Sequence, residues 1–252
     1  MVQTRDAAAP GAAVAFDYDN LLGAIRRRFT VHQYRPDPVP DEIIEKVLEA
    51  GRWAPSGANS QPWEFIVVKD RALIEQLGDV IHREAISLRA ADPKFNFPNY
   101  EYVRGMSCII VVIADPRTKR IINHPRPPEN KEKTFLFSLA ACIEHMHLAA
   151  TCFGLGCTWL TVQETGPYEM EIRQLLDIPD PYRVAILTPI GRPWRWPRIP
   201  ERRRPLAELV HRDRFDRAKL RDDAQLEEFL RTKTLRKGKG SWDFAAAQEG
   251  QP

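Results

Sequence analysis

The residues best placed to do chemistry lie in a loop of small residues and amides. Residues 54–63 read Ala-Pro-Ser-Gly-Ala-Asn-Ser-Gln-Pro-Trp, between a helix-like stretch and a strand-like one. Such a loop lets backbone amides and short polar side chains approach a flat, polar ligand without steric bulk. It holds no obvious acid, base or nucleophile, so a bound cofactor would have to supply the chemistry.

Two basic clusters lie far apart in the sequence. The first is Arg26-Arg27-Arg28 with Thr30 and His32, and the second is Arg202-Arg203-Arg204. Each cluster could be a run of solvated charges. Together they favour a site in which both clusters bind one dianion from opposite sides. Arginine binds phosphate with a planar, permanently charged fork, and a threonine hydroxyl adds a further donor.

The net charge of +3 hides a strongly basic segment from Arg192 to Lys239. Nucleic-acid binding is one interpretation of that segment, and a localised anion site with a solvated tail is another. We find no nucleic-acid motif and no aromatic platform, so nucleic acid is the less favoured partner. The sequence also lacks the Gly-x-Ser-x-Gly motif of hydrolases, the Gly-x-Gly-x-x-Gly dinucleotide fingerprint and a metal-ligand spacing.

Cysteine usage and the N-terminus indicate a cytoplasmic protein. The four cysteines, Cys108, Cys142, Cys152 and Cys157, show no Cys-x-x-Cys spacing and are expected to be free thiols in a reducing compartment. Residues 1–15 lack the basic-then-apolar pattern of a signal peptide. We find no apolar run that approaches a membrane span, so no membrane association is expected.

Periodicity predicts an α+β fold in which helices wrap a mixed central sheet. Helices are expected over residues 18–28, 41–54, 70–88 (as one or two helices), 134–153 and 168–176, and strands over 65–69, 108–114 and 183–190. Asp41 is expected to cap its helix, and Gly154-Leu155-Gly156 to end the long one. That long helix is apolar nearly all round, which favours a central position or a subunit interface.

The chain divides into three parts by composition. Residues 1–16 are expected to be disordered, residues 17–211 to form the folded domain, and residues 212–252 to form a charged C-terminal extension. The irregular segments 89–104 and 115–133 are candidate lids, because loops this aromatic or this long often cover a site.

Four motifs in order resemble the nitroreductase family of FMN-dependent oxidoreductases. They are the stretch from Arg28 to Pro40, the loop 54–63, the glycine turn 154–159, and Ile190-Gly-Arg-Pro followed by Arg203-Arg-Pro-Leu. The resemblance covers roughly residues 20–211. It implies a nitroreductase-like fold, a homodimer with FMN at the interface, and an extension that wraps the partner subunit.

The resemblance also implies an activity. NADH or NADPH would reduce FMN at N5, and an electron-poor acceptor such as a nitroaromatic, quinone or activated alkene would then be reduced in the same pocket by a ping-pong mechanism. Alternatives on the same scaffold are a reductive dehalogenase and a flavin-fragmenting enzyme. A non-catalytic flavin carrier or sensor is the alternative from another class.

Residue roles follow from the same resemblance, position by position. Arg28 and Thr30, with Arg27 beside them, would hold the phosphate and ribityl chain, and His32 would face the N1/O2 edge of the flavin ring. The remaining cofactor candidates are Pro55, Ser56, Gly57 and Asn59 along the ring, Trp159, Leu160 and Thr161 near N5 and O4, and Arg202, Arg203 and Arg204 at the phosphate. The substrate candidates are Phe97, Tyr100, Tyr102 and Trp194. No metal is expected.

His32 is one of three departures from the family pattern, with Phe29 and Glu201. The family usually has a permanent cation at the position of His32, whereas a histidine titrates near neutral pH. One hypothesis is therefore that flavin reduction weakens as rising pH deprotonates His32. The alternative is a neutral His32 that donates a hydrogen bond.

Overall fold

The computed structural model describes residues 17–91, 100–122, 125, 127–196 and 203–233 of the chain. The predictions of a disordered segment over residues 1–16 and of roles for Phe97 and Arg202 lie outside the described residues. Its helices and strands, in chain order, are α1 (Tyr18–Arg27), α2 (Asp41–Arg52), β1 (Trp63–Val68), α3 (Arg71–Ala91), β2 (Ile109–Ala114), α4 (Pro128–Cys152), β3 (Gly156–Cys157), α5 (Pro167–Leu175), β4 (Arg183–Gly191), α6 (Leu206–Leu209) and α7 (Asp223–Lys233). Short 3-10 turns, η1 (Gly57–Asn59), η2 (Glu101–Gly105), η3 (Pro116–Arg120) and η4 (Arg217–Lys219), fill several of the connections.

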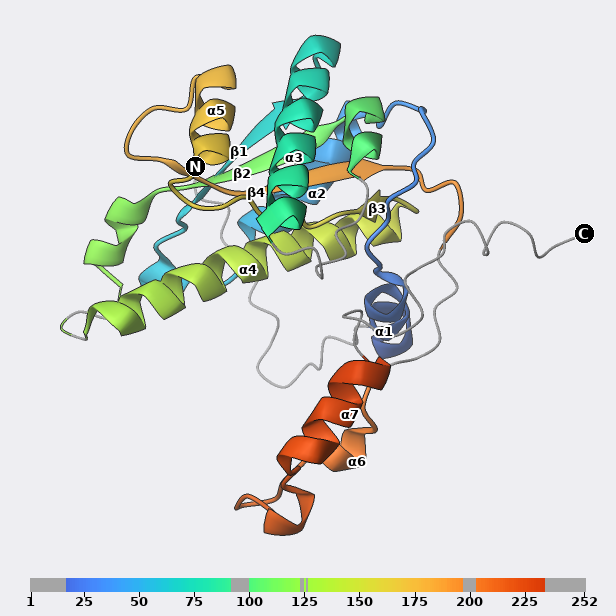
Figure 1. Ribbon diagram of the computed structural model, residues 1–252, viewed down its shortest axis with the longest axis vertical. Helices are drawn as coiled ribbons and strands as arrows, with labels where there is room; N and C mark the ends of the chain where they lie inside the picture. The colour runs from blue at the N-terminus through green and yellow to red at the C-terminus, as the bar shows by residue number, and fades with distance from the viewer. Residues whose placement is uncertain (1–16, 92–99, 123–124, 126, 197–202, 234–252) are drawn as a thin grey trace, which may run out of the picture.

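The four strands form one sheet in the order β1-β2-β4-β3, and each strand pair is antiparallel. A parallel element joins this sheet as a single bridge between Thr30 and Cys157. Helices cover both faces, as Figure 1 shows, so the α+β architecture is confirmed. The mixed character of the sheet rests on that one bridge.

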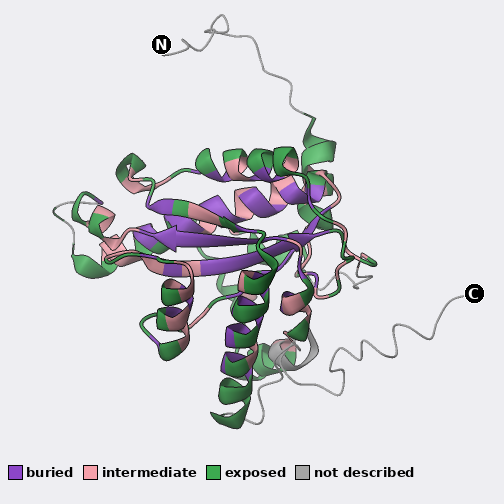
Figure 2. Cartoon of the chain, turned by 90° about the horizontal axis from the view of Figure 1, so that it is seen from above, coloured by how far each residue is buried: buried purple, intermediate pink, exposed green. Residues whose placement is uncertain are grey.

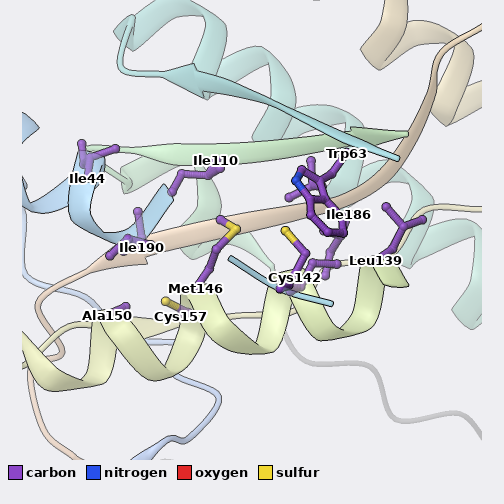
Figure 3. Packing of buried hydrophobic residues seen from close by; sticks show 14 of the residues in the cluster. Ile44, Trp63, Ile110, Leu139, Cys142, Met146, Ala150, Cys157, Ile186 and Ile190 are labelled. Carbon is purple, nitrogen blue, oxygen red and sulfur yellow. The ribbon is translucent and has the colours of Figure 1, made fainter. Parts of the chain in front are cut away.

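Strand β2 is apolar throughout because both of its faces are buried (Figure 2). Ile110 and Val112 point into a core with α2 and α4, which Figure 3 shows packed around Cys142 and Met146. The alternate residues of the strand enter a second core with α3 and α5. Since side chains of a strand alternate between faces, one continuous apolar strand serves two separate helix layers.

Three predicted helix boundaries need correction. Helix α2 begins at Asp41 itself, and the Asp41 carboxylate forms an ion pair with Lys69 at 2.6 Å instead of capping the helix. The segment expected as one or two helices over 70–88 is the single helix α3, which runs on to Ala91, and the Asp70 side chain caps its start by accepting a hydrogen bond from the backbone N–H of Leu73. Helix α4 begins at Pro128, within the segment that we expected to be irregular, since proline favours the first helical position.

The glycine turn after α4 has two physical causes. Gly154 has a φ of +70°, a left-handed conformation that favours glycine at a helix end. At Gly156 an added Cβ would lie 2.5 Å from Cγ2 of Val31, so the absence of a side chain lets two segments approach closely. The predicted end of the long helix is therefore confirmed. The second glycine, Gly156, lets the segment around Val31 pack closely against β3.

Helix α4 corrects the expectation that no stretch is long and apolar enough for a membrane span. By length and composition alone, α4 is long and apolar enough to cross a membrane. Half of its apolar stretch is buried inside the fold, however, as in the core helix of a globular domain. It packs along α2 and contributes Leu139, Ile143 and Met146 to the first core. On its other side Leu136 and Phe137 remain 50% and 66% exposed.

The C-terminal helices α6 and α7 stand apart from the layered body in Figure 1. Lys219 ties this segment together by donating to the backbone carbonyls of Ala207 and Val210, both at 2.7 Å. Several large apolar side chains of the segment remain exposed, namely Leu206, Leu209, Phe215, Leu220 and Leu226.

Candidate functional site

Three of the four sequence motifs meet at the β3 edge of the sheet. Thr30 bridges to Cys157, and the backbone N–H of Val31 donates to the Cys157 carbonyl at 3.2 Å. Four residues further along the chain, the backbone N–H of Arg35 donates to the Arg192 carbonyl at 2.8 Å. The N-terminal motif is thus held between the glycine turn and the end of β4.

Arg28 stands at the C-terminal end of α1, where its guanidinium pairs with Glu144 of α4 at 3.3 Å. Its side chain is 24% exposed, so it sits at the surface of the body with one face toward solvent. Arg27 instead stacks on Trp196, with its guanidinium carbon 4.8 Å from the ring centroid. Of these two arginines, Arg28 is the one that lies beside Thr30 and the central helix.

His32 faces a cluster of tyrosines rather than open solvent. Its ring centroid lies 5.4 Å from that of Tyr102, which in turn lies 5.7 Å from that of Tyr34. Burial lowers the pKa of His32 to about 4, so its ring is neutral near pH 7. The expectation that His32 titrates near neutral pH is therefore wrong for this state, and the neutral hydrogen-bonding alternative is favoured.

A polar pair lies behind this cluster. The Tyr34 hydroxyl and the Thr158 hydroxyl are 2.8 Å apart, and Thr158 donates to the Val31 carbonyl. The Tyr102 hydroxyl is buried beside Thr158 but has no hydrogen bond of good geometry within the described residues. A buried polar atom without such a partner is costly unless a ligand or water completes it.

The segment 159–161 presents its backbone to a small cavity. Leu160 exchanges both backbone hydrogen bonds with Leu187 of β4, at 3.0 and 2.9 Å. Because successive residues of an extended chain direct their backbone groups to opposite sides, those of Trp159 and Thr161 face away from β4. The backbone N–H and C=O of Leu160 are thus used in the sheet. The backbone groups of Trp159 and Thr161 are the better candidates to bind a ligand.

That cavity has a volume of about 110 Å³ and lies between α3, η2 and the segment 159–161. It is lined by Ile81, Glu84, Ala85, Leu88, Tyr100, Trp159, Leu160 and Thr161. The structure therefore brings one predicted substrate residue, Tyr100, next to the predicted flavin-facing segment. Tyr102 lies near it, with ring centroids 6.4 Å apart.

Sequence reasoning missed Glu84, the charged residue of this cavity. Glu84 is 6% exposed, and burial raises the pKa of its carboxyl. The signal was present, because Glu84 falls on the buried stripe of α3 with Ile74, Leu77 and Ile81, where a carboxylate is rarely tolerated without a partner.

The loop 55–61 lies elsewhere on the same chain. The backbone N–H of Gly57 donates to the Ser138 hydroxyl of α4 at 3.1 Å, whereas Trp159 packs edge-on against His147, with ring centroids 5.9 Å apart. The nine residue steps from Ser138 to His147 span about 14 Å of helix. The loop that carries Pro55, Ser56, Gly57 and Asn59 is therefore anchored to α4 about 14 Å along the helix from the point where Trp159 packs.

Three further predicted residues stand apart from the cavity. Arg204 pairs with Glu208 of α6 at 3.2 Å, and Arg203 is exposed next to it. Trp194 is 62% exposed and lies over Arg35, 5.8 Å from its guanidinium carbon. The structure places none of the three against Arg28 or Tyr100.

The comparisons with known proteins identify the family of the chain. The sequence model of the nitroreductase family matches residues 25–192. A protein of Archaeoglobus fulgidus, provisionally named NADH dehydrogenase/NAD(P)H nitroreductase, is 30% identical over 175 residues, which are 69% of this chain and 86% of that one. The 5,6-dimethylbenzimidazole synthase of Rhodospirillum rubrum is 29% identical over 192 residues, covering 73% and 86% of the two chains.

A solved structure shares the fold. It is described as a nitroreductase from Desulfovibrio desulfuricans in complex with FMN, and it is 28% identical, with a TM-score of 0.55 over 80% of this chain and all of that chain. The α+β layers thus form a nitroreductase fold. The chain belongs to the nitroreductase family, as its four motifs predicted.

Proposed function

We propose that this chain passes electrons from NADH or NADPH through a bound FMN to an electron-poor acceptor in the cavity beside Trp159. As a member of its family, it is an FMN-dependent NAD(P)H oxidoreductase of the nitroreductase type. The single observation that supports the placement is the pairing of Thr30 and Val31 with Cys157, which sets the stretch from Arg28 to His32 beside the turn that leads to Trp159.

The donor set at this edge fits a phosphorylated flavin. Arg28 and the Thr30 hydroxyl supply a cation and a donor at one end, as a phosphate requires. At the other end, the buried Tyr102 hydroxyl and the neutral His32 ring supply polar groups beside an aromatic wall. A planar ring with polar edges matches such a surface.

When bound, FMN supplies the two-electron chemistry, taking a hydride from NAD(P)H and delivering it to an acceptor such as a nitroaromatic, quinone or activated alkene. The residues of this chain bind and orient. Arg28 and Thr30 would hold the phosphate, His32 would donate a hydrogen bond to the N1/O2 edge, and the backbone of Trp159 and Thr161 would meet the N5/O4 edge. Tyr100 would line the pocket that the nicotinamide and the acceptor enter in turn.

A second copy of the chain completes this site in our proposal. The loop 55–61 stays about 14 Å along α4 from Trp159 in its own protomer, so a partner would contribute it. Exposed apolar side chains on α1 and α4 support an isologous interface there, among them Leu21 and Ile25 on α1 and Leu136 and Phe137 on α4. The apolar side chains of α6 and α7 would then wrap the partner.

Burial and free thiols support a reducing, cytoplasmic setting. The four cysteines are free, and three of them are buried. Burial raises the pKa of both Cys108 and Cys142 to about 12, which leaves their thiols unreactive near pH 7.

Steady-state oxidation of NADH and NADPH, with and without a quinone or nitroaromatic acceptor, tests the proposal. We expect turnover that depends on both the nicotinamide and the acceptor. A protein that binds FMN but does not turn over would instead be a carrier or sensor. Release of a flavin fragment in air, or turnover confined to aryl halides, would identify the flavin-fragmenting or the dehalogenating alternative.

A further inference from the structure

The cavity beside Trp159 combines an apolar wall with several polar residues, and Glu84 is the one ionisable carboxyl among its described lining residues. Ile81, Ala85 and Leu88 of α3 form its apolar wall, and Glu84 lies between them on the same helix face. Burying a carboxylate in such a place is costly unless hydrogen bonds compensate it. The Glu84 carboxyl therefore needs hydrogen-bond partners at this position.

One carboxyl oxygen of Glu84 has a structural partner. Oε1 accepts a hydrogen bond from the backbone N–H of Gln163 at 3.0 Å, which ties the segment after Thr161 to α3. A carboxylate can accept several hydrogen bonds through its two oxygens. The Gln163 contact therefore uses only part of the capacity of Glu84, and Glu84 is also one of the residues that line the cavity.

Tyr100 completes the polar part of the cavity. The negative charge of Glu84 adds to burial in raising the pKa of the Tyr100 phenol, which reflects how near the two groups lie. The cavity thus combines an acceptor, a phenol and an apolar wall, next to the aromatic face of Trp159.

We infer that Glu84 determines substrate choice, by accepting a hydrogen bond from a hydroxyl or amine donor on the apolar body of the acceptor molecule. The inference rests on the proposed function, because it places the acceptor in the cavity next to the flavin-facing segment. The inference predicts that the substrate carries, besides its reducible group, a hydrogen-bond donor a short distance from the electron-poor centre. A site that accepts such a hydrogen bond discriminates strongly against analogues that lack the donor.

A pair of probes tests the inference by binding alone. The oxidised, FMN-loaded protein is titrated with para-nitrobenzyl alcohol and with its methyl ether, and the change in flavin absorbance gives each Kd. We expect the alcohol to bind about tenfold more tightly, because the hydrogen bond to the buried carboxyl is lost in the ether. Equal affinities in the wild-type protein would overturn the inference.

Two variants separate recognition from structure. E84Q keeps an oxygen for the Gln163 N–H and presents an NH₂ donor in place of the second oxygen, so the preference for the alcohol should disappear. E75Q alters an exposed carboxylate of the same helix, which pairs with Arg71, and should keep the preference. If E84Q retains the wild-type ratio, Glu84 only fastens the chain at Gln163. Failure to load FMN at all would count against the proposed function and not against Glu84 alone.

Discussion

The guanidinium of Arg28 lies 3.3 Å from the carboxylate of Glu144, so a carboxylate of the central helix occupies the neighbourhood in which we place a phosphate. The two side chains are 24% and 44% exposed, and an exposed pair of this kind adds little to stability. Its main effect would be electrostatic, because Glu144 competes with the phosphate for Arg28.

Glu144→Gln should therefore tighten FMN binding. Removing one negative charge a few ångströms from a dianion is worth about 1 kcal/mol at low salt, or about fivefold in Kd. The gain should shrink at high ionic strength, and the melting temperature of the cofactor-free protein should hardly change. Fluorescence titration of FMN at two salt concentrations measures the effect. Weaker FMN binding in E144Q would mean that Glu144 positions Arg28 for the phosphate.

Gly156→Ala should destabilise the protein by about 1–3 kcal/mol, because the new methyl group would meet the buried Val31 side chain. Val31→Ala removes Cγ2, the atom nearest to the new methyl group, and leaves Cβ at 2.9 Å, so it relieves the clash in part while it costs stability by itself through lost packing. In a double-mutant cycle measured by urea unfolding, the two changes should be less harmful together than their sum. Simple additivity would show that the Val31 contact is not what requires glycine.

The glycine turn illustrates what the sequence could predict. Its two glycines, the small-residue loop and the run of buried apolar residues in β2 each carry a local signal, so the family, the fold class and the order of elements were predictable. The start of α4 at Pro128 was not, since that first turn is charged and resembles a loop. The neutral state of His32 also escaped prediction, because it depends on burial beside Tyr102, which lies far away in the sequence.

Glu84 and the loop 55–61 mark the limit of such reasoning for the site. Glu84 is a candidate site residue because it lines the same cavity as Tyr100 and Trp159, and only the tertiary structure brings these residues together. The loop had a clear sequence signature, yet its distance from Trp159 in the protomer could not be inferred from the sequence. The resemblance supplied the expectation of a partner, and the spacing along α4 now gives that expectation a geometric reason.

His147 should make the cofactor-free protein less stable in acid. Burial, aided by the charge of Arg28, lowers the pKa of His147 to about 4 from an ordinary value near 6.5. Between these two values the unfolded chain binds a proton that the folded chain does not, so stability falls as the pH falls through that window. The shift corresponds to roughly 3 kcal/mol for this residue.

Urea unfolding of the wild type and of His147→Gln at pH 7 and pH 5 measures this linkage. The variant should lose less stability between the two pH values, whatever its stability at pH 7. Burial lowers the pKa of His32 in the same way, so some acid sensitivity should persist in the variant. Parallel losses in the two proteins would show that His147 is not the group that titrates.

A mixed dimer tests whether each site uses two chains. Arg28→Ala should weaken the grip on the phosphate, and Ser56→Trp should block the ring from the loop. The extended backbone at Ser56 accepts tryptophan, although the change loses the hydrogen bond that the Ser56 hydroxyl accepts from the Gln61 N–H. In a heterodimer of the two variants, one site combines the intact Arg28 of one chain with the intact loop of the other. That dimer should bind one FMN with wild-type affinity, while both homodimers bind weakly. Weak binding in the heterodimer as well would place each site within one chain.

The uptake of FMN by the purified chain is the most direct test of the central claim. Protein freed of small molecules is titrated with FMN and, in parallel, with riboflavin, and the visible absorption spectrum is followed. We expect one FMN per chain, a flavin spectrum perturbed by binding, and at least tenfold weaker binding of riboflavin, which lacks the phosphate that Arg28 would hold. A protein that stays colourless in the presence of FMN, or that binds both flavins equally, would contradict this account.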